Sequence, residues 1–145
     1  MSQEDKTRAA LQTVLDVYCG RHPKGFRALA EICRPDFWFR DPFVEIHGLD
    51  AFKKFMRETG AHRTSTEWIV AGHAATGTSG YVRWRYVATF HEGPPLDFEG
   101  MTEFGFDAEG RLAFHIDFWD SADALTVRVP SLRNVIQDAK KDVHV

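Results

Sequence analysis

Residues 114–120 alternate between apolar and polar side chains with a period of two. One face of this stretch carries Phe114, Ile116 and Phe118, and the other carries His115, Asp117 and Trp119. Such alternation predicts a β-strand that separates two environments. A face that combines an imidazole, a carboxylate and an indole differs from an ordinary solvated strand face. We therefore expect this face to line a pocket that the rest of the fold encloses.

The first 60 residues have a helical pattern that is interrupted by one short pair of strands. Apolar side chains recur at spacings of three and four over residues 2–20, 23–33 and 49–60, which predicts three helices. Residues 36–41 alternate as a strand, and residues 44–47 form a short returning strand. Pro42 separates these two strands, because proline cannot donate to a strand ladder.

The period changes to two in the second half of the chain. Four strands are predicted there, over residues 68–75, 81–90, 96–106 and 112–119. Their connections are short and rich in glycine and proline, which predicts an antiparallel meander. A helical tail follows, broken at Pro130. Helices grouped early and strands grouped late predict one α+β domain over residues 1–145, with the helices on one face of a curved sheet.

Composition removes several classes of function. The 145 residues carry a formal net charge of −3 and no long basic run, which argues against a nucleic-acid-binding surface. No stretch approaches the roughly 20 apolar residues of a membrane span, and the N-terminus lacks an apolar signal region. We expect a cytoplasmic protein without a membrane partner, in which Cys19 and Cys33 are reduced thiols.

The seven histidines do not cluster at ligand spacing, and His115 with Asp117 would supply only two ligands, so no metal site and no cofactor are predicted. Aromatic residues make up 13% of the chain, a share that fits either a wide core or the wall of an apolar cavity.

Three local signatures carry a resemblance to a known family. They are Phe-Arg-Asp-Pro-Phe at residues 39–43, Phe-Asp-Ala-Glu-Gly-Arg-Leu at 106–112 and His-Ile-Asp-Phe-Trp-Asp at 115–120. In this order and spacing the chain resembles the nuclear transport factor 2-like (NTF2-like) superfamily, which includes ketosteroid isomerases, SnoaL-type polyketide cyclases and limonene epoxide hydrolases. The resemblance implies an NTF2-like, cystatin-like cone with a small-molecule site in its mouth, and a homodimer through the sheet face. Because this fold hosts unrelated functions, the reaction has to be argued from individual residues.

Asp117 is the leading catalytic candidate. In polyketide cyclases and limonene epoxide hydrolases, an aspartate in a similar Asp-aromatic-aromatic-Asp context on the last strand is catalytic, and residues 117–120 have that shape. His115 shares its strand face, and a histidine beside a carboxylate is a usual acid–base arrangement. The alternative for His115 is a hydrogen-bonded cavity histidine that takes no part in chemistry.

Asp41 and Tyr18 match, by resemblance, two catalytic residues of the ketosteroid isomerases. Asp41 lies where those enzymes keep the aspartate that moves the substrate proton, and it follows Phe37 and Phe39 on one strand face. The alternative is a structural aspartate that opens an Asp-Pro turn. Tyr18 matches the tyrosine that donates a hydrogen bond to the developing oxyanion. The alternative is a core tyrosine whose hydroxyl reaches the rim.

Thr102 occupies the position of the isomerases' second, protonated aspartate. A threonine hydroxyl is a weaker acid, which argues against steroid isomerisation.

Arg83 and Arg85 stand where epoxide hydrolases have Arg-x-Asp. Arg83 corresponds to the arginine of that motif, but Arg85 stands where the motif has its aspartate. This argues against water activation and favours binding of a substrate carboxylate or enolate. We expect both arginines to point into the cone and pair with Asp41 or Asp117. In the reverse register they would be a solvated face, and Trp84 would line the pocket.

The outer face of the sheet is expected to form the dimer interface. In the register that points the arginines inward, this face would carry Trp84, Tyr86, Glu99, Met101 and Glu103. Mixed aromatic and charged residues on an exposed sheet face fit such an interface.

The sequence thus predicts a cofactor-independent isomerase, cyclase or lyase that acts on a small apolar or aromatic molecule with a carbonyl or ring. Asp41, or the His115–Asp117 pair, would move a proton, while Tyr18 and an arginine stabilise the oxyanion. The alternative is a non-catalytic small-molecule-binding protein of the same fold. The predicted substrate-binding residues are Phe37, Phe39, Phe55, Arg83, Arg85, Thr102 and Trp119.

Overall fold

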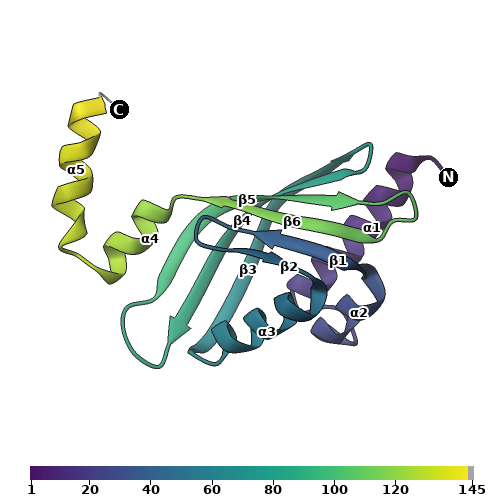
Figure 1. The fold of residues 1–145 in the computed structure, drawn as a ribbon, viewed down its shortest axis with the longest axis horizontal. Coiled ribbons are helices and arrows are strands. Elements are labelled where there is room, and N and C mark those ends of the chain that lie inside the picture. Colours follow the sequence, from purple (N-terminus) through teal and green to yellow (C-terminus); the bar gives the residue numbers. More distant parts are fainter. Residues whose placement is uncertain (144–145) are drawn as a thin grey trace.

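The computed structural model describes residues 1–143 (Figure 1). Its N-terminal part runs α1 (Gln3–Tyr18), the 3-10 helix η1 (Gly25–Ala28), α2 (Leu29–Ile32), β1 (Cys33–Arg40), β2 (Glu45–His47) and α3 (Leu49–Gly60). Its C-terminal part runs β3 (Arg63–Thr76), β4 (Ser79–Phe90), β5 (Leu96–Phe106), β6 (Leu112–Trp119), α4 (Ser121–Arg128) and α5 (Leu132–Val143). No helix within residues 1–143 combines the length and apolarity that a bilayer crossing requires.

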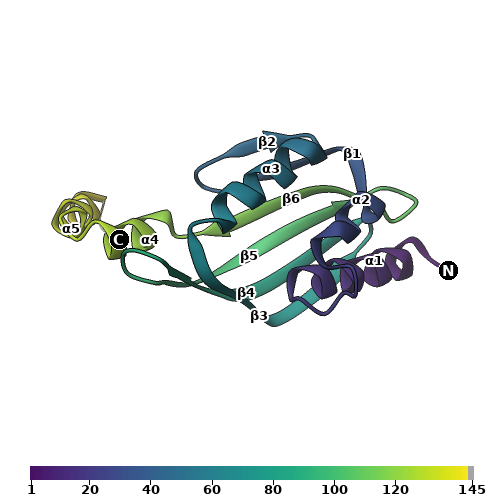
Figure 2. The ribbon, with the colours of Figure 1, turned by 90° about the horizontal axis from the view of Figure 1, so that it is seen from below.

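The six strands form one mixed sheet in the order β2-β1-β6-β5-β4-β3. β3 to β6 form the predicted antiparallel meander, and β1 joins it by parallel pairing with β6. α1 packs against β3 and β4, and α3 packs against β1 and β2. Figure 2 shows both helices on the same side of the twisted sheet, with β5 and β6 between them. This arrangement confirms the α+β fold with helices on one face of a curved, mostly antiparallel sheet.

Helix α1 forms because its first turn is capped and its inner face is apolar. The backbone N–H of Asp5 donates to Ser2 Oγ at 3.1 Å, and the Asp5 carboxylate accepts from the Ser2 backbone at 3.2 Å. This capping box satisfies two of the N–H groups that a helix start leaves unpaired. Leu11, Val14 and Leu15 then bury the stripe that faces the sheet. α1 is therefore fixed along the sheet, with Tyr18 at its C-terminal end.

The core between α3 and the sheet is built from aromatic rings. Phe37 and Phe39 of β1 contact Phe52 of α3, with ring centres 5.0 and 5.2 Å apart. Phe37, Phe52 and Phe104 are fully buried. Gly48 precedes α3 with φ of +94°, a conformation that favours glycine, and allows the chain to turn from β2 into the helix. Phe37, expected to contact substrate, is thus a core residue.

Most element boundaries agree with the sequence pattern, including β5, β6 and the break of the C-terminal helix between α4 and α5. Two predictions were wrong. The helix predicted over 23–33 is replaced by η1 and the single turn of α2, and β1 begins at Cys33. Gly25, with φ of +55°, prevents a continuous helix from Pro23. β3 begins at Arg63 instead of residue 68, because its polar first residues pair with β4 through backbone groups that no side-chain pattern reveals.

The two cysteines are free, and their thiols should differ in reactivity. Cys33 is 5% exposed, and burial raises the pKa of its thiol to about 12. At pH 8 only about one Cys33 thiol in ten thousand would be ionised, and the thiolate is the reactive form. We expect Ellman's reagent to modify one thiol, the half-buried Cys19, in the native protein and both thiols in guanidinium chloride. Rapid modification of two thiols in the native protein would contradict this assignment.

Candidate functional site

The polar face of β6, which its alternating sequence predicts, lies on the helix-covered side of the sheet. β6 lies between β1 and β5, and Asp117 pairs with Thr102 of β5. His115 is 3% exposed on the inner side, while Phe118 is 53% exposed on the outer side. The pairing therefore places His115 and Asp117 on the helix-covered face, next to the C-terminal end of α1.

Five side chains from four elements form one hydrogen-bonded relay around Asp117. Trp84 Nε1 lies 2.8 Å from Thr102 Oγ1, and Thr102 Oγ1 lies 2.5 Å from Asp117 Oδ1. On the other side, His115 Nε2 lies 2.6 Å from the same Asp117 oxygen, and His115 Nδ1 lies 3.0 Å from the Tyr18 hydroxyl. The sequence placed four of these residues at the site, and the relay adds Trp84.

The chemistry of the groups fixes the direction of each hydrogen bond. An indole N–H can only donate, so Thr102 accepts from Trp84 and donates its own hydrogen to Asp117. A carboxylate can only accept, so with Asp117 in that form His115 donates from Nε2, and a ring with a single N–H then accepts at Nδ1 from Tyr18. The hydrogen bonds from Thr102 and His115 thus meet at Asp117 Oδ1, and His115 is held in one tautomer and one orientation.

Asp117 is the member of the relay best placed to meet a ligand. Its side chain is 18% exposed, compared with 4% for His115, and Thr102 is 1% exposed as a residue. Both hydrogen bonds to the carboxylate end on Oδ1, and Oδ2 makes none within residues 1–143. One carboxylate oxygen is therefore anchored from behind, and the other is available to accept a proton from a bound molecule.

The imidazole of His115 is enclosed by aromatic rings. Its centre lies 4.8 Å from the Phe104 ring, 4.9 Å from Phe39 and 5.2 Å from Tyr18. Burial raises the pKa of the Tyr18 hydroxyl well above its ordinary value, followed by smaller contributions from Cys33 and Asp117. Tyr18 therefore keeps its hydrogen and its bond to His115 at every physiological pH.

An aromatic surface extends from this relay along the inner face of the sheet. Successive ring centres lie between 4.9 and 6.0 Å apart, through Tyr18, Trp68, Trp84, Phe98, Trp119 and Phe43. Apart from buried Trp84 and exposed Phe43, these residues are half-buried. Phe55 of α3 is half-buried as well and contacts Phe39. Half-buried aromatic side chains beside a few oriented polar groups are typical of sites for small apolar ligands.

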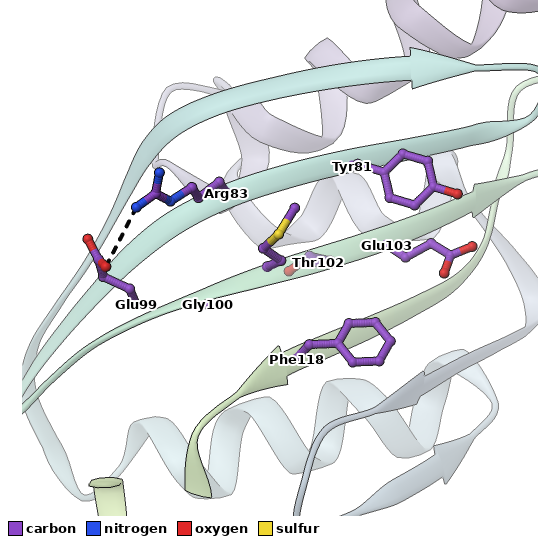
Figure 3. A pocket seen from close by; sticks show the side chains of 8 residues that line it. Tyr81, Arg83, Glu99, Gly100, Thr102, Glu103 and Phe118 are labelled. Atoms are coloured by element: carbon purple, nitrogen blue, oxygen red, sulfur yellow. Dashed lines mark ion pairs between the residues drawn. The ribbon is translucent and has the colours of Figure 1, made fainter. Parts of the chain in front are cut away.

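The predicted inward orientation of Arg83 and Arg85 is wrong. Both side chains lie on the outer face of the sheet, where Arg83 is 3.8 Å from Glu99 and Arg85 is 2.6 Å from Asp97 (Figure 3 shows the Arg83–Glu99 pair). The reverse register, left open by the sequence, is the observed one. Arg83 and Arg85 therefore do not contact Asp117.

Trp84 points inward because its neighbour on β5 is a glycine. Trp84 pairs with Gly100, and a Cβ at Gly100 would lie 2.5 Å from the Trp84 ring. The missing side chain leaves room for the indole to lie across β5 and reach Thr102. Tyr86 follows Trp84 onto the inner face, so its expected outer position is also wrong, whereas Glu99, Met101 and Glu103 lie outside as predicted.

Asp41 does not join the relay. Its Oδ1 accepts hydrogen bonds from the backbone N–H groups of Phe43, at 2.7 Å, and Val44, at 2.9 Å. These bonds form the turn between β1 and β2, which is the structural use that the Asp-Pro sequence allowed. The structure thus brings together Tyr18, Thr102, His115 and Asp117 and leaves Asp41 in the turn between β1 and β2.

The surface also carries two hollows. One, of about 370 Å³, lies on the outer sheet face between Arg83, Met101 and Phe118 (Figure 3), and one of about 280 Å³ lies between β5 and the two C-terminal helices. Within residues 1–143, no three His, Cys, Asp or Glu side chains gather as a metal site would require.

Comparison with known proteins agrees with this architecture. The model of the SnoaL-like domain family matches residues 16–115, more than half of the chain. No protein of curated function matches the sequence.

Three solved structures illustrate the fold. A candidate SnoaL-like polyketide cyclase from Jannaschia sp. CCS1 is similar with a TM-score of 0.74 and 16% identity, over 88% of this chain and 94% of that one. An NTF2-like protein of unknown function from Burkholderia pseudomallei K96243 has a TM-score of 0.72 and 19% identity, over 88% and 98%. An epoxide hydrolase of the LEH-like type from M. tuberculosis has a TM-score of 0.71 and 14% identity, over 94% and 99%. At these identities the likeness shows the fold alone.

The buried Tyr18 hydroxyl should affect stability at alkaline pH. Because its pKa is raised in the folded state, its contribution is fully present below the unfolded pKa of about 10 and is lost as pH rises toward the folded pKa. Relative to Tyr18→Phe, the wild-type free energy of unfolding should fall by up to about 1.4 kcal/mol per pH unit above pH 10. Urea unfolding between pH 8 and 11 measures this. Tyr81→Phe, on the outer face, is the control and should follow the wild type; parallel curves for Tyr18→Phe would contradict the burial of a protonated phenol.

Proposed function

We propose that this chain, which belongs to the SnoaL-like domain family, is a cofactor-independent enzyme that moves a proton on a small molecule with a ring or carbonyl. Its candidate site combines an anchored carboxylate with an aromatic surface. The observation that carries the proposal is the convergence of two hydrogen bonds on Asp117 Oδ1, which leaves Oδ2 without a partner within residues 1–143. An oriented carboxylate of this kind is suited to general acid–base catalysis.

In the proposed mechanism Asp117 is the catalytic residue. Its Oδ2 accepts a proton from a carbon or hydroxyl of the bound molecule and returns it to another position, which fits an isomerase, cyclase or lyase. His115 and Thr102 are positioning residues that hold the carboxylate through Oδ1, and Tyr18 acts through His115 because its hydrogen is donated to Nδ1. Tyr18 is thus a supporting residue in this proposal and no longer an oxyanion donor.

The aromatic surface supports the proposed substrate class. Trp119 and Phe98 lie beside Asp117 along the sheet, with ring centres 4.9 Å apart, and offer flat apolar surface to a planar ring. The relatives' names include a candidate cyclase and an epoxide hydrolase. An epoxide-hydrolase-like site would need an arginine next to Asp117. Both arginines of β4 lie on the opposite face of the sheet, so β4 does not supply it. This favours the cyclase and isomerase classes.

Removal of the proposed base should slow proton exchange strongly. We expect the wild-type protein in D₂O to introduce deuterium beside the carbonyl of at least one member of a panel of ring ketones, followed by NMR. Asp117→Asn keeps the size of the side chain but should lower the exchange rate by about 10²- to 10⁴-fold, the usual contribution of a general base.

Asp97→Asn is the matched control, because Asp97 lies on the outer face in an ion pair with Arg85. It should exchange at the wild-type rate. Equal rates for Asp117→Asn and the wild type would refute the proposed role of Asp117. Ketones that stabilise the wild-type protein against heat without any exchange would instead support the non-catalytic binding protein.

A homodimer through the outer sheet face is the proposed assembly. This face is apolar at its centre, where Tyr81, Met101 and Phe118 are 38, 47 and 53% exposed. Arg83, Glu99 and Glu103 surround them with charge (Figure 3). An apolar centre with a charged rim is the usual anatomy of a protein interface. A second copy of the chain would cover these side chains by the same surface on both partners.

A charge placed at the centre of this surface should separate the subunits. We expect light scattering to give twice the chain mass of 16.5 kDa for the wild-type protein and a single chain mass for Phe118→Glu, because a dimer would bury the new carboxylate without a partner. Val135→Glu is the control. Val135 is 64% exposed on α5, outside the strands that form this face, and the variant should remain dimeric. A monomeric wild-type protein would contradict the proposed assembly.

A further inference from the structure

Two buried polar atoms on the inner side of the sheet have no hydrogen-bond partner within residues 1–143. They are Nε of Arg63, at the start of β3, and the hydroxyl oxygen of Tyr86 on β4. The two side chains lie together, since the Arg63 guanidinium carbon is 5.5 Å from the centre of the Tyr86 ring. Buried polar groups are nearly always paired in native proteins, so two adjacent exceptions need a physical reason.

The pair lies at the far end of the aromatic surface that begins at Asp117. Tyr86 faces Trp68 on β3 and Phe98 on β5, and the Tyr86 and Phe98 ring centres are 5.6 Å apart. Phe98 in turn contacts Trp119, the inward neighbour of Asp117 on β6. A continuous line of rings therefore connects the carboxylate of Asp117 with Arg63 and Tyr86 on one face of the sheet.

The two groups have the chemistry of an acid-binding site. Arg63 makes no ion pair with any residue of the described chain, although nine other lysine and arginine side chains do. A guanidinium recognises carboxylates through directed N–H donors. Burial raises the pKa of the Tyr86 hydroxyl, so this group stays protonated and can donate as well. Two adjacent donors, one of them charged, thus lack the acceptor oxygen that buried polar groups normally have.

We propose that Arg63 and Tyr86 form a subsite that binds the carboxylate of an aromatic or similarly planar acid lying along the ring surface. This inference deepens the proposed function, on which it rests for the reaction at the Asp117 end, because it names the second polar group of the substrate. A negative charge at the Arg63 end also orients the molecule, since the Asp117 carboxylate repels the same group at the other end.

Isothermal titration calorimetry with 2-naphthoate and 2-naphthamide tests the subsite. The two probes share their rings and carbonyl, and the acid alone carries a charge. We expect the wild-type protein to bind the acid about tenfold more tightly than the amide, as a charge-assisted hydrogen bond allows. Arg63→Gln and Tyr86→Phe should each weaken acid binding by about tenfold and leave amide binding within about twofold.

Arg83→Gln and Tyr81→Phe are the matched controls, because the same residue types line the outer groove (Figure 3). Both should bind the acid as the wild type does. Arg63→Lys, which keeps the charge, should retain part of the preference for the acid. Circular dichroism confirms that each variant is folded, and Tyr86→Phe removes only a hydroxyl that has no partner.

Three results would overturn the subsite: equal binding of acid and amide by the wild-type protein, equal losses in Arg63→Gln and Arg83→Gln, or no binding of either probe at millimolar concentration. Asp117→Asn separates this inference from the proposed function. If that variant binds the acid normally and also exchanges protons at the wild-type rate, the catalytic role of Asp117 fails while the subsite stands.

Discussion

The hydrogen bonds that join Trp84, Thr102 and Asp117 across three strands are the constraint on which the site depends. They require β4, β5 and β6 to keep one register, in which Val82, Thr102 and Asp117 lie side by side. A slip of one residue would turn Asp117 to the outer face and place Phe118 inside. The absence of a side chain at Gly100 is part of the same constraint, because the Trp84 indole occupies the space above it. Strand pairing and site geometry are therefore specified together.

The polar groups at the site can be buried because each of them forms a hydrogen bond with another. A carboxylate or an imidazole beneath aromatic rings would destabilise the fold if it were unpaired. Here His115 uses both ring nitrogens, and Thr102 both accepts and donates. The donors lie in the core behind Asp117, so the cost of burial is offset on that side and the reactive oxygen can face the aromatic surface. Loss of Tyr18, Thr102, His115 or Asp117 would leave a buried polar atom without a partner, which couples the stability of the core to the geometry of the site.

The sequence predicted the inner face of β6 because a histidine, a carboxylate and an indole alternate there with purely apolar side chains. It could not orient β4, where arginines alternate with aromatic residues and either face could point inward. That choice depends on Gly100 and Thr102, which lie on another strand and meet Trp84 only after folding. The role of Asp41 could not be predicted for a similar reason. An aspartate before a proline can be a catalytic base or a turn residue, and only its hydrogen bonds to the backbone in the folded chain identify it as a turn residue. The contact of Arg63 with Tyr86 was likewise invisible, because the sequence pattern gave no sign that β3 begins at Arg63.

The register of the sheet also sets the length of a molecule that would contact both Asp117 and the proposed Arg63–Tyr86 subsite. Asp117 lies level with Val82 through Thr102, and Tyr86 is four residues further along β4. At about 3.3 Å per residue, the carboxylate and Tyr86 are separated by about 13 Å along the strand direction. A single ring cannot reach both ends, whereas two or three fused rings with a carboxylate can. The aromatic side chains between the two ends provide apolar contact over that whole length, so shape, charge and reactivity would select the same kind of molecule: an elongated, planar acid whose reactive position lies far from its carboxylate.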